Sequence, residues 1–491
     1  MIFNSLEFAL FLPIVFFLYW FVVPKSYKQQ NVLIVSASCL FYGWWDWRFL
    51  GLILISVLID FSIGLMLFKE KEKWKRKVLL WASIIVNLGL LGFFKYYNFF
   101  LDSFISAFSF CGVKIGATSL EIILPVGISF YTFQTLSYTI DIYREKLHPA
   151  RNLISFAAFV SFFPQLVAGP IERASNLLPQ FQKERTFDYQ KATDGLRQIL
   201  WGLFKKVVIA DNCAEYANLI FNNSADYSGT TLVLGALFFT FQIYGDFSGY
   251  SDIAIGTSRL FGFNLRKNFA FPYFSRDVAE YWRCWHISLS SWFKDYLYIP
   301  LGGSKGGMAL KIRNTFIIFI VSGFWHGANW TYVVWGLLNA IYFLPLLLTN
   351  KNRNNIEVIA KGKLFPTLKE SGSVLVTFSL TVFAFIIFRA ESLTHAMNYM
   401  YSLFSGLLTK SGIANGINFI YWEIYWKGGL LIFLFLVLFI IIEWIGRDQE
   451  HAIAQLGRRW KRPFRWFFYY GVILCIVLCG GKGQDFIYFQ F

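Results

Sequence analysis

Long apolar stretches constrain this chain more than any other feature. Several of them, among them 48–68, 230–262 and 372–389, reach about the 20 residues that a helix needs to cross a hydrocarbon layer about 30 Å thick. Hydrophobic residues make up 56% of the sequence. Charged residues make up 15%, against about 25% in soluble domains. The stretches are too long for the short alternating strands of a membrane barrel, so the sequence predicts an all-α polytopic membrane protein.

The positive charge is concentrated in a few segments. The formal net charge is +16, and 23 of the 45 lysine and arginine residues lie in four connectors, 69–77, 182–206, 351–369 and 447–465. Connectors rich in lysine and arginine face the cytoplasm in membrane proteins. The charge is thus explained by membrane topology, and we expect the lipid bilayer and no nucleic acid among the partners.

The charges and the apolar stretches together predict a topology. The first 23 residues lack a basic amino-terminal region and a small-residue cleavage site, which indicates a retained span that starts outside. Following the chain from there predicts about ten crossings in one transmembrane domain, 1–491, with both termini extracytoplasmic. The segments expected outside the regular crossings are re-entrant pieces near 152–170 and 314–349, short cytoplasmic-face helices in 264–313, and an extracytoplasmic tail, 481–491.

Histidine is the first candidate for chemistry. Of five histidines, only His286 and His326 lie within sequence rich in tryptophan and phenylalanine. A polar ring in an apolar core needs hydrogen-bond partners and is uncommon without a structural or functional reason. Burial keeps an imidazole neutral and therefore able to act as a general base. The alternative for His326 is a structural histidine that bonds a carbonyl group, and for His286 a brace for the short helix ahead of Ser288.

Buried acids and a glycine-rich loop are weaker candidates. Asp246 and Asp252 fall in an apolar stretch and should face the protein interior, either in a hydrogen-bonded packing site or at a substrate. The loop 302–307 does not match the phosphate-loop pattern, so we expect a mobile cytoplasmic loop in which Lys305 weakly contacts a nucleotide-bearing donor. Six cysteines without a CxxC pair predict neither a disulfide framework nor a metal site.

Five motifs occur in an order that resembles a known family. They are FFPQLVAGP at 162–170, DFSGYSD at 246–252, YWRCWHISLS at 281–290, WFKDYLYIPLGG at 292–303 and GFWHG at 323–327. Together they resemble the membrane-bound O-acyltransferase family. Within that family the chain is most similar to the membrane subunits of bacterial alginate and peptidoglycan O-acetyltransferases, and the likeness runs from the first span to the last residue.

This resemblance implies a fold and a set of site residues. It implies a helical bundle with re-entrant helices and a central tunnel, in which His326 is catalytic and His286 contributes from the cytoplasmic side. It also implies that Tyr488, in the aromatic tail, is a transient acyl carrier; docking of the tail to a partner is the alternative. Cys284 and Lys294 depart from the family, in which arginine is more usual, and this weakens the case for a donor-phosphate contact by either. The residues expected to bind substrate are Asp246, Trp285, Trp325, Asn329 and Lys305.

The combined prediction is an O-acetyltransferase of the bacterial inner membrane. Acetyl-CoA supplies an acetyl group from the cytoplasm at His326, and an SGNH-type extracytoplasmic acetyltransferase partner completes its transfer to an alginate-like polysaccharide or peptidoglycan; no permanently bound cofactor is expected. A phenol has a pKa near 10, so Tyr488 needs a base such as His326 to become a nucleophile. The alternatives are D-alanyl transfer to teichoic acid and a lipid-linked saccharide transporter that binds through Asp246 and Asp252.

Overall fold

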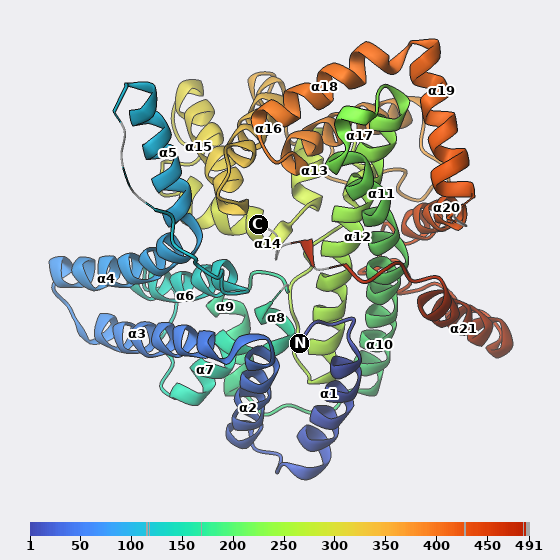
Figure 1. The fold of residues 1–491 in the computed structure, drawn as a ribbon. Coiled ribbons are helices and arrows are strands. Elements are labelled where there is room, and N and C mark those ends of the chain that lie inside the picture. The colour runs from blue at the N-terminus through green and yellow to red at the C-terminus, as the bar shows by residue number, and fades with distance from the viewer. Residues whose placement is uncertain (114–115, 117, 168, 427–428, 485, 488–491) are drawn as a thin grey trace. The chain divides into compact units, whose positions relative to one another are not determined.

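The computed structural model describes residues 1–113, 116, 118–167, 169–426, 429–484 and 486–487 (Figure 1). Throughout these residues the regular elements are helices, which confirms the predicted all-α fold class. The chain divides into two compact units, Met1–Leu196 with Ala254–Arg266 and Arg197–Ile253 with Lys267–Phe491. The division falls inside two helices, α10 (Tyr189–Leu203) and α12 (Thr230–Leu260). The assignment of 1–491 to one domain stays a prediction.

Many of the helices have the length and composition of membrane spans. Six stretches of the described residues are long and apolar enough to cross a membrane: Tyr27–Lys69, Lys73–Phe110, Thr230–Leu260, Met308–His326, Trp330–Leu348 and Leu368–Arg389. Large apolar side chains on them, such as Leu54, Ile85 and Leu375, are exposed and suited to lipid. The count of ten crossings stays a prediction.

The first unit contains the amino-terminal helices. Asn152 caps α7 by accepting a hydrogen bond from the Ser155 amide, and α7 ends at Ser161, just before α8 begins at Phe163 with Pro164 in its first turn. The segment near 152–170 is therefore interrupted between two short helices, and its re-entrant character stays a prediction. The helices are α1 (Leu6–Phe17), α2 (Tyr27–Asp46), α3 (Leu50–Lys69), α4 (Lys73–Leu91), α5 (Tyr97–Phe110), α6 (Ile128–Tyr143), α7 (Leu153–Ser161), α8 (Phe163–Leu166) and α9 (Ala174–Leu177).

A buried polar cluster joins three helices of the first unit. Asp60 of α3 accepts hydrogen bonds from the Ser83 hydroxyl (2.6 Å) and the Asn87 amide (2.8 Å) of α4. The Asn87 carbonyl oxygen in turn accepts from Ser56 of α3 (3.1 Å) and Thr135 of α6 (3.0 Å). Because these groups bond one another, the cluster compensates for the burial of polar atoms between apolar helices.

The second unit contains the elements that carry the candidate site. The region 264–313 contains short helices, and its place at the cytoplasmic face stays a prediction; α15 begins at Met308, before the predicted start of the re-entrant piece at residue 314. The helices are α11 (Asp211–Asn222), α13 (Val278–Cys284), α14 (Ile287–Phe293), α15 (Met308–His326), α16 (Trp330–Leu348), α17 (Leu368–Arg389), α18 (Leu393–Leu407), α19 (Lys410–Phe419), α20 (Leu431–Ile445) and α21 (Arg462–Leu478), with π-helical turns at Phe204–Ala210 (η5) and Lys294–Tyr298 (η8).

Helices α15 and α16 pack side by side as a hairpin (Figure 1). A Cβ atom on Gly323 would collide with the carbonyl oxygen of Tyr332, and one on Gly336 with that of Phe319. Glycine at these two positions therefore allows the backbones to approach closely. The turn that joins the helices places His326 at the last position of α15.

Two basic residues of the 182–206 segment do not lie in a connector. Lys205 and Lys206 lie in η5 and are buried, and both form ion pairs with aspartates. The prediction that all the basic residues of this segment face the cytoplasm from a connector is therefore wrong for this pair. The physical reason is that a buried carboxylate stabilises a lysine ammonium group inside an apolar helix. The presence of a lysine therefore does not by itself show that the segment is exposed.

Candidate active site

His326 lies at the centre of a ring of aromatic side chains. The residue is 3% exposed. The Trp335 ring, from α16, lies edge-on to it at 5.2 Å between centroids, and the Phe388 ring, from α17, lies at 5.5 Å. Trp325, its neighbour in α15, lies at 5.1 Å. The hairpin and α17 thus hold the imidazole in a largely apolar environment.

His286 is held from one side by an asparagine. Its backbone adopts the left-handed conformation (φ 45°), an uncommon state for a non-glycine residue, at the start of α14. Its Nδ1 lies 3.1 Å from the Oδ1 atom of Asn268. The same Oδ1 atom accepts from the Ser288 amide (3.3 Å) and hydroxyl (2.8 Å), while the Asn268 amide nitrogen donates to Ser251 (3.0 Å).

These contacts fix the tautomer of His286. A backbone amide only donates, so the bond from Ser288 identifies the atom of Asn268 that it meets as the carbonyl oxygen. That oxygen is an acceptor, and therefore Nδ1 of His286 carries the proton and donates it. The basic lone pair of the neutral ring then resides on Nε2.

The two histidines form a pair. Their ring centroids are 6.5 Å apart and the ring planes are inclined by 58°. Burial, followed by the proximity of His326, lowers the pKa of His286 well below its usual value. His286 is consequently neutral at physiological pH. The pair brings together two residues that the sequence places 40 positions apart.

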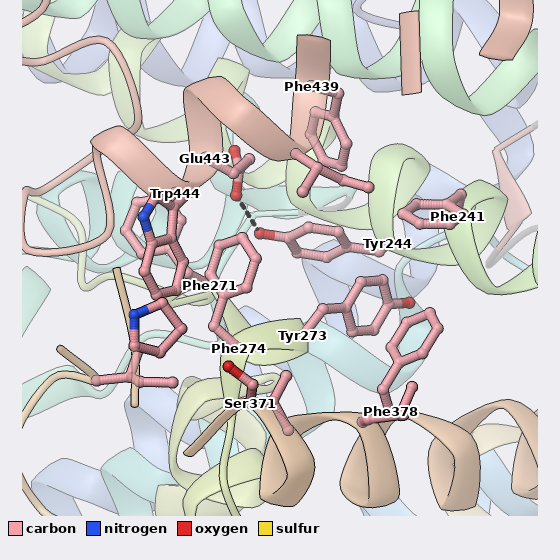
Figure 2. Close-up of a pocket in the computed structure, with 15 residues that line it drawn as sticks. Phe241, Tyr244, Phe271, Tyr273, Phe274, Ser371, Phe378, Phe439, Glu443 and Trp444 are labelled. Carbon is pink, nitrogen blue, oxygen red and sulfur yellow. Dashed lines mark hydrogen bonds between the residues drawn. The ribbon is translucent and has the colours of Figure 1, made fainter. Parts of the chain in front are cut away.

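An apolar cavity of about 370 Å³ is lined mainly by aromatic side chains, among them Tyr244, Tyr273 and Phe439 (Figure 2). Residues of α12, α17 and α20 line it. Among the residues that line this cavity is Glu443, whose carboxyl group accepts hydrogen bonds from the Tyr244 hydroxyl (2.6 Å) and the Trp201 indole (2.9 Å). Tyr273, another wall residue, stacks on Trp285 at 6.2 Å.

A second cavity, of about 490 Å³, is basic. Lys294, Lys311 and Arg353 line it together with hydroxyl and amide side chains from Tyr298, Ser304, Thr315, Asn350 and Asn352. Phe319 belongs to the same wall. A series of ring contacts leads from this wall to the histidine: Phe319 to Trp282 at 5.3 Å, Trp282 to Trp335 at 5.7 Å, and Trp335 to His326 at 5.2 Å.

Comparison with known proteins establishes the family. The chain matches the sequence model of the membrane-bound O-acyltransferase family over residues 39–358. It belongs to this family. The resemblance seen in the sequence motifs is thereby confirmed, and the chain is an O-acyltransferase and a multi-pass membrane protein.

Individual relatives narrow the comparison. The acyltransferase is 39% identical over 412 residues to the probable alginate O-acetylase AlgI of Azotobacter vinelandii, covering 82% of this chain and 78% of the relative. It is 34% identical over 444 residues to the peptidoglycan O-acetyltransferase of Helicobacter pylori, covering 84% and 81%. It is 26% identical over 284 residues to the teichoic acid D-alanyltransferase of Bacillus subtilis, covering 55% and 70%.

The structure of the acyltransferase brings together some of the predicted site residues. His286, His326, Trp285 and Trp325 lie in one aromatic cluster, in which Trp325 is 5.9 Å from His286. Trp285 packs among Tyr281, Phe269 and Phe385, the arrangement of a core residue.

Other predicted residues lie elsewhere or outside the described residues. Asn329 caps α16 by accepting from the Thr331 amide, and its own amide donates to the Glu391 carbonyl. Lys305 is exposed on its loop. Tyr488 lies outside the described residues. Substrate binding by Asn329 and Lys305 stays a prediction.

Sequence reasoning missed several residues of the acyltransferase that shape this region. Asn268 lies in a polar segment without a recognisable motif, and only the fold brings it to His286. Lys311 and Arg353 come from different segments and meet only in the cavity. Lys206 did carry a signal, because two adjacent lysines in the otherwise apolar run 204–210 require buried partners.

Proposed function

We propose that this O-acyltransferase transfers an acetyl group from acetyl-CoA in the cytoplasm across the membrane for O-acetylation of an extracytoplasmic polysaccharide. The observation that carries the proposal is the buried pair of His326 and His286, the second of which Asn268 holds in a single tautomer. A neutral, preoriented imidazole in an apolar environment is suited to general-base catalysis. The similarity to alginate and peptidoglycan O-acetyltransferases supports the acetyl group as the cargo.

The proposed reaction needs one base and one nucleophile. His326 removes the proton of an acceptor hydroxyl, and the oxygen attacks the carbonyl carbon of the acetyl thioester. The carbon–oxygen bond forms, the carbon–sulfur bond breaks, and the proton held by His326 passes to the departing thiolate. General-base catalysis of this kind contributes about 10²- to 10⁴-fold. His286 positions the acetyl group or its acceptor beside the base.

The basic cavity is the proposed entrance for the donor. The phosphate groups of acetyl-CoA are complementary in charge to Lys294, Lys311 and Arg353. The ring contacts from Phe319 to His326 mark the path along which the thioester would extend from this cavity to the base. At position 294 a lysine replaces the arginine that is more usual in the family, and it keeps the charge but not the bidentate geometry.

The proposed acceptor is the phenol of Tyr488. His326 takes its proton, the acetyl group becomes an aryl ester, and a hydroxyl of the next acceptor later displaces the phenolate, which recovers a proton. We propose that this next acceptor belongs to an SGNH-type extracytoplasmic partner or to the polysaccharide.

The same proposal places one acyltransferase domain, with both termini extracytoplasmic, in the bacterial inner membrane, and includes a central tunnel and re-entrant segments near 152–170 and 314–349.

The decisive experiment follows an isotopic label. Purified protein in lipid nanodiscs is given acetyl-CoA labelled in the acetyl group, and release of CoA and labelling of the protein are measured. We expect both in the wild type and neither in His326→Ala. Equal turnover in the variant would remove His326 from the reaction, and absence of turnover in a wild type that binds the donor would reject acetyl-CoA.

D-alanyl transfer is the second candidate because of the similarity to teichoic acid D-alanyltransferases. That similarity is lower, at 26% to 28% identity, and covers 55% to 59% of the chain, against 39% and 82% for the alginate relative. The same assay with D-alanine on a carrier protein distinguishes the candidates. Labelling from the D-alanyl carrier in place of acetyl-CoA would support D-alanyl transfer.

A further inference from the structure

A buried cluster of three charged side chains binds the carboxy-terminal segment. The ammonium group of Lys206, in η5, lies 2.8 Å from Asp211 and 2.9 Å from Asp246, and all three side chains are at most 3% exposed. The same ammonium group donates to the backbone oxygen of Gln484 at 2.9 Å. The second oxygen of Asp246 accepts the backbone amide of Ile487 at 2.7 Å.

The tail completes the hydrogen bonding of this cluster. A lysine ammonium group has three protons, and the two aspartates with the Gln484 carbonyl supply three acceptors. Asp246 gives one oxygen to Lys206 and the other to Ile487. Without the segment 484–487, a buried donor and a buried carboxylate oxygen would each lose a partner, which is costly for charged groups.

A second ion pair on the same two helices provides a contrast. The ammonium group of Lys205 lies 2.5 Å from the carboxylate of Asp252. Lys205 directly precedes Lys206 in the sequence, and Asp252 follows Asp246 by six residues. Asp252 also accepts from the side chain of Gln198 at 2.7 Å. The contacts of Asp252 are therefore with helix residues, whereas those of Asp246 include the tail.

The tail reaches the aromatic cluster of the histidine pair. The start of the tail is bound to η5 and α11, since the Gly481 amide donates to the Val207 carbonyl at 3.1 Å and the Asn212 side chain donates to the Cys479 carbonyl at 3.0 Å. Phe486 is fully buried and packs on Tyr250 at 4.1 Å between centroids. Phe247, at 6.2 Å from Phe486, is edge-on to His286 at 4.6 Å.

We propose that Lys206, Asp211 and Asp246 form a clamp that binds the protein's own carboxy-terminal segment and holds it beside the histidine pair. These three are positioning residues, because they act through the backbone of the tail. The consequence for catalysis rests on the proposed function, in which Tyr488 carries the acetyl group: the clamp binds Gln484 and Ile487, and loss of this binding should slow acetyl transfer to Tyr488. Binding of the tail itself does not depend on that chemistry.

Hydrogen exchange tests the binding directly. The variant Asp246→Asn keeps the shape of the side chain but has one acceptor oxygen where two are needed. We expect the amides of 484–487 to exchange about 10- to 100-fold faster than in the wild type, the factor that corresponds to the loss of one charge-assisted hydrogen bond. Asp252→Asn is the matched control and should leave exchange in the tail unchanged. Equal protection in both variants and the wild type would overturn the clamp.

A pair of tail variants guards against misfolding of the core. Ile487→Pro removes the amide proton that Asp246 accepts, and Ile487→Ala keeps it. We expect faster exchange at 484–486 in the proline variant than in the alanine variant, with the remainder of the unit protected equally in both. The opposite order would overturn the assignment of Asp246 as the acceptor.

Acetyl labelling separates this inference from the proposed function. In Asp246→Asn we expect acetyl transfer to the carboxy-terminal peptide to fall about tenfold or more, while binding of acetyl-CoA is kept. If faster exchange of the tail is seen and the wild type carries no acetyl group, the clamp stands and the relay through Tyr488 fails. If the tail is acetylated as fast in the variant as in the wild type, the positioning role fails.

Discussion

Two buried polar clusters of this protein, one in each unit, show how differently polar groups serve an apolar helical protein. Around Asp60 the side chains bond one another across α3, α4 and α6. Around His286 a single acceptor, the Asn268 carbonyl oxygen, collects three donors and orients the imidazole toward a cluster of aromatic rings. The first arrangement joins three helices through hydrogen bonds between side chains, and the second fixes the orientation of the His286 ring.

The difference gives a criterion for reading buried polar residues in membrane proteins. A carboxylate whose hydrogen bonds end on neighbouring side chains stabilises packing, and its loss should appear in stability. In the proposed function, the histidine pair serves catalysis, and the loss of either histidine should appear in turnover. The two clusters should therefore respond to substitution in different measurements.

Substitution of His326 is the strongest test of this contrast. We expect His326→Ala to lower acetyl turnover about 10²- to 10⁴-fold, because the base is removed. The cavity left by the imidazole should lower the apparent melting temperature in detergent, so the test is the turnover per folded molecule, which the loss of packing alone would not change. Turnover is measured with labelled acetyl-CoA at matched amounts of folded protein. A variant with wild-type turnover would show that the histidine cluster is as structural as the Asp60 cluster.

Substitution of Asp60 should give the reverse result. Asp60→Ala leaves the buried donors of Ser83 and Asn87 without their carboxylate, so the free energy of unfolding should fall by roughly 2–5 kcal/mol. The turnover number per folded molecule should stay within about twofold of the wild type, because the hydrogen bonds of Asp60 lie within the first unit and the proposed catalytic residues belong to the second. Thermal unfolding and active-site titration measure the two quantities. A large loss of turnover with unchanged stability contradicts the assignment.

Asn268 sharpens the comparison because its role is to position His286. In Asn268→Ala the Nδ1 proton loses its acceptor, both tautomers become accessible, and we expect turnover to fall on the order of tenfold. The pH profile of turnover should also shift. Asn268→Asp keeps an acceptor and should restore part of the activity, whereas a purely structural asparagine would affect stability and leave the pH profile in place.

The basic cavity predicts a smaller effect confined to donor binding. We expect the double variant Lys294→Ala, Lys311→Ala to raise the KM for acetyl-CoA about tenfold with a smaller change in kcat, since two charges near the donor phosphates are lost. Acetyl-pantetheine, which lacks the nucleotide phosphates, is the control donor and should respond little. An equal effect on both donors would exclude phosphate recognition in this cavity.

The smallest predicted effect is a dependence of stability on pH. Burial lowers the pKa of His286, so below pH about 6.5 the unfolded chain binds a proton that the folded chain does not. Stability is then kept above this pH and falls below it, by at most about 1.4 kcal/mol per pH unit for this group. In His286→Gln the apparent melting temperature should depend less steeply on pH between pH 6.5 and 5, because the uptake of this one proton on unfolding is lost. An unchanged slope would contradict a neutral buried His286.

Much of the fold was predictable from local sequence. The lengths of the apolar stretches indicate α3, α12 and α17 close to their observed bounds, because a helix in lipid satisfies its backbone hydrogen bonds within its own segment. The same reasoning failed at Lys205 and Lys206. Their exposure depends on partners in α11 and α12, which the local sequence does not reveal.

The sequence by itself determined that the protein is an all-helical membrane protein and that His286 and His326 are the histidines to consider. Only the tertiary structure decided that these two rings lie 6.5 Å apart, that Asn268 orients one of them, and that Asp246 meets both Lys206 and the carboxy-terminal segment. The reason is physical. Helix formation in an apolar medium follows from local composition, whereas the pairing of buried polar groups is set by which helices pack together across long distances in the chain.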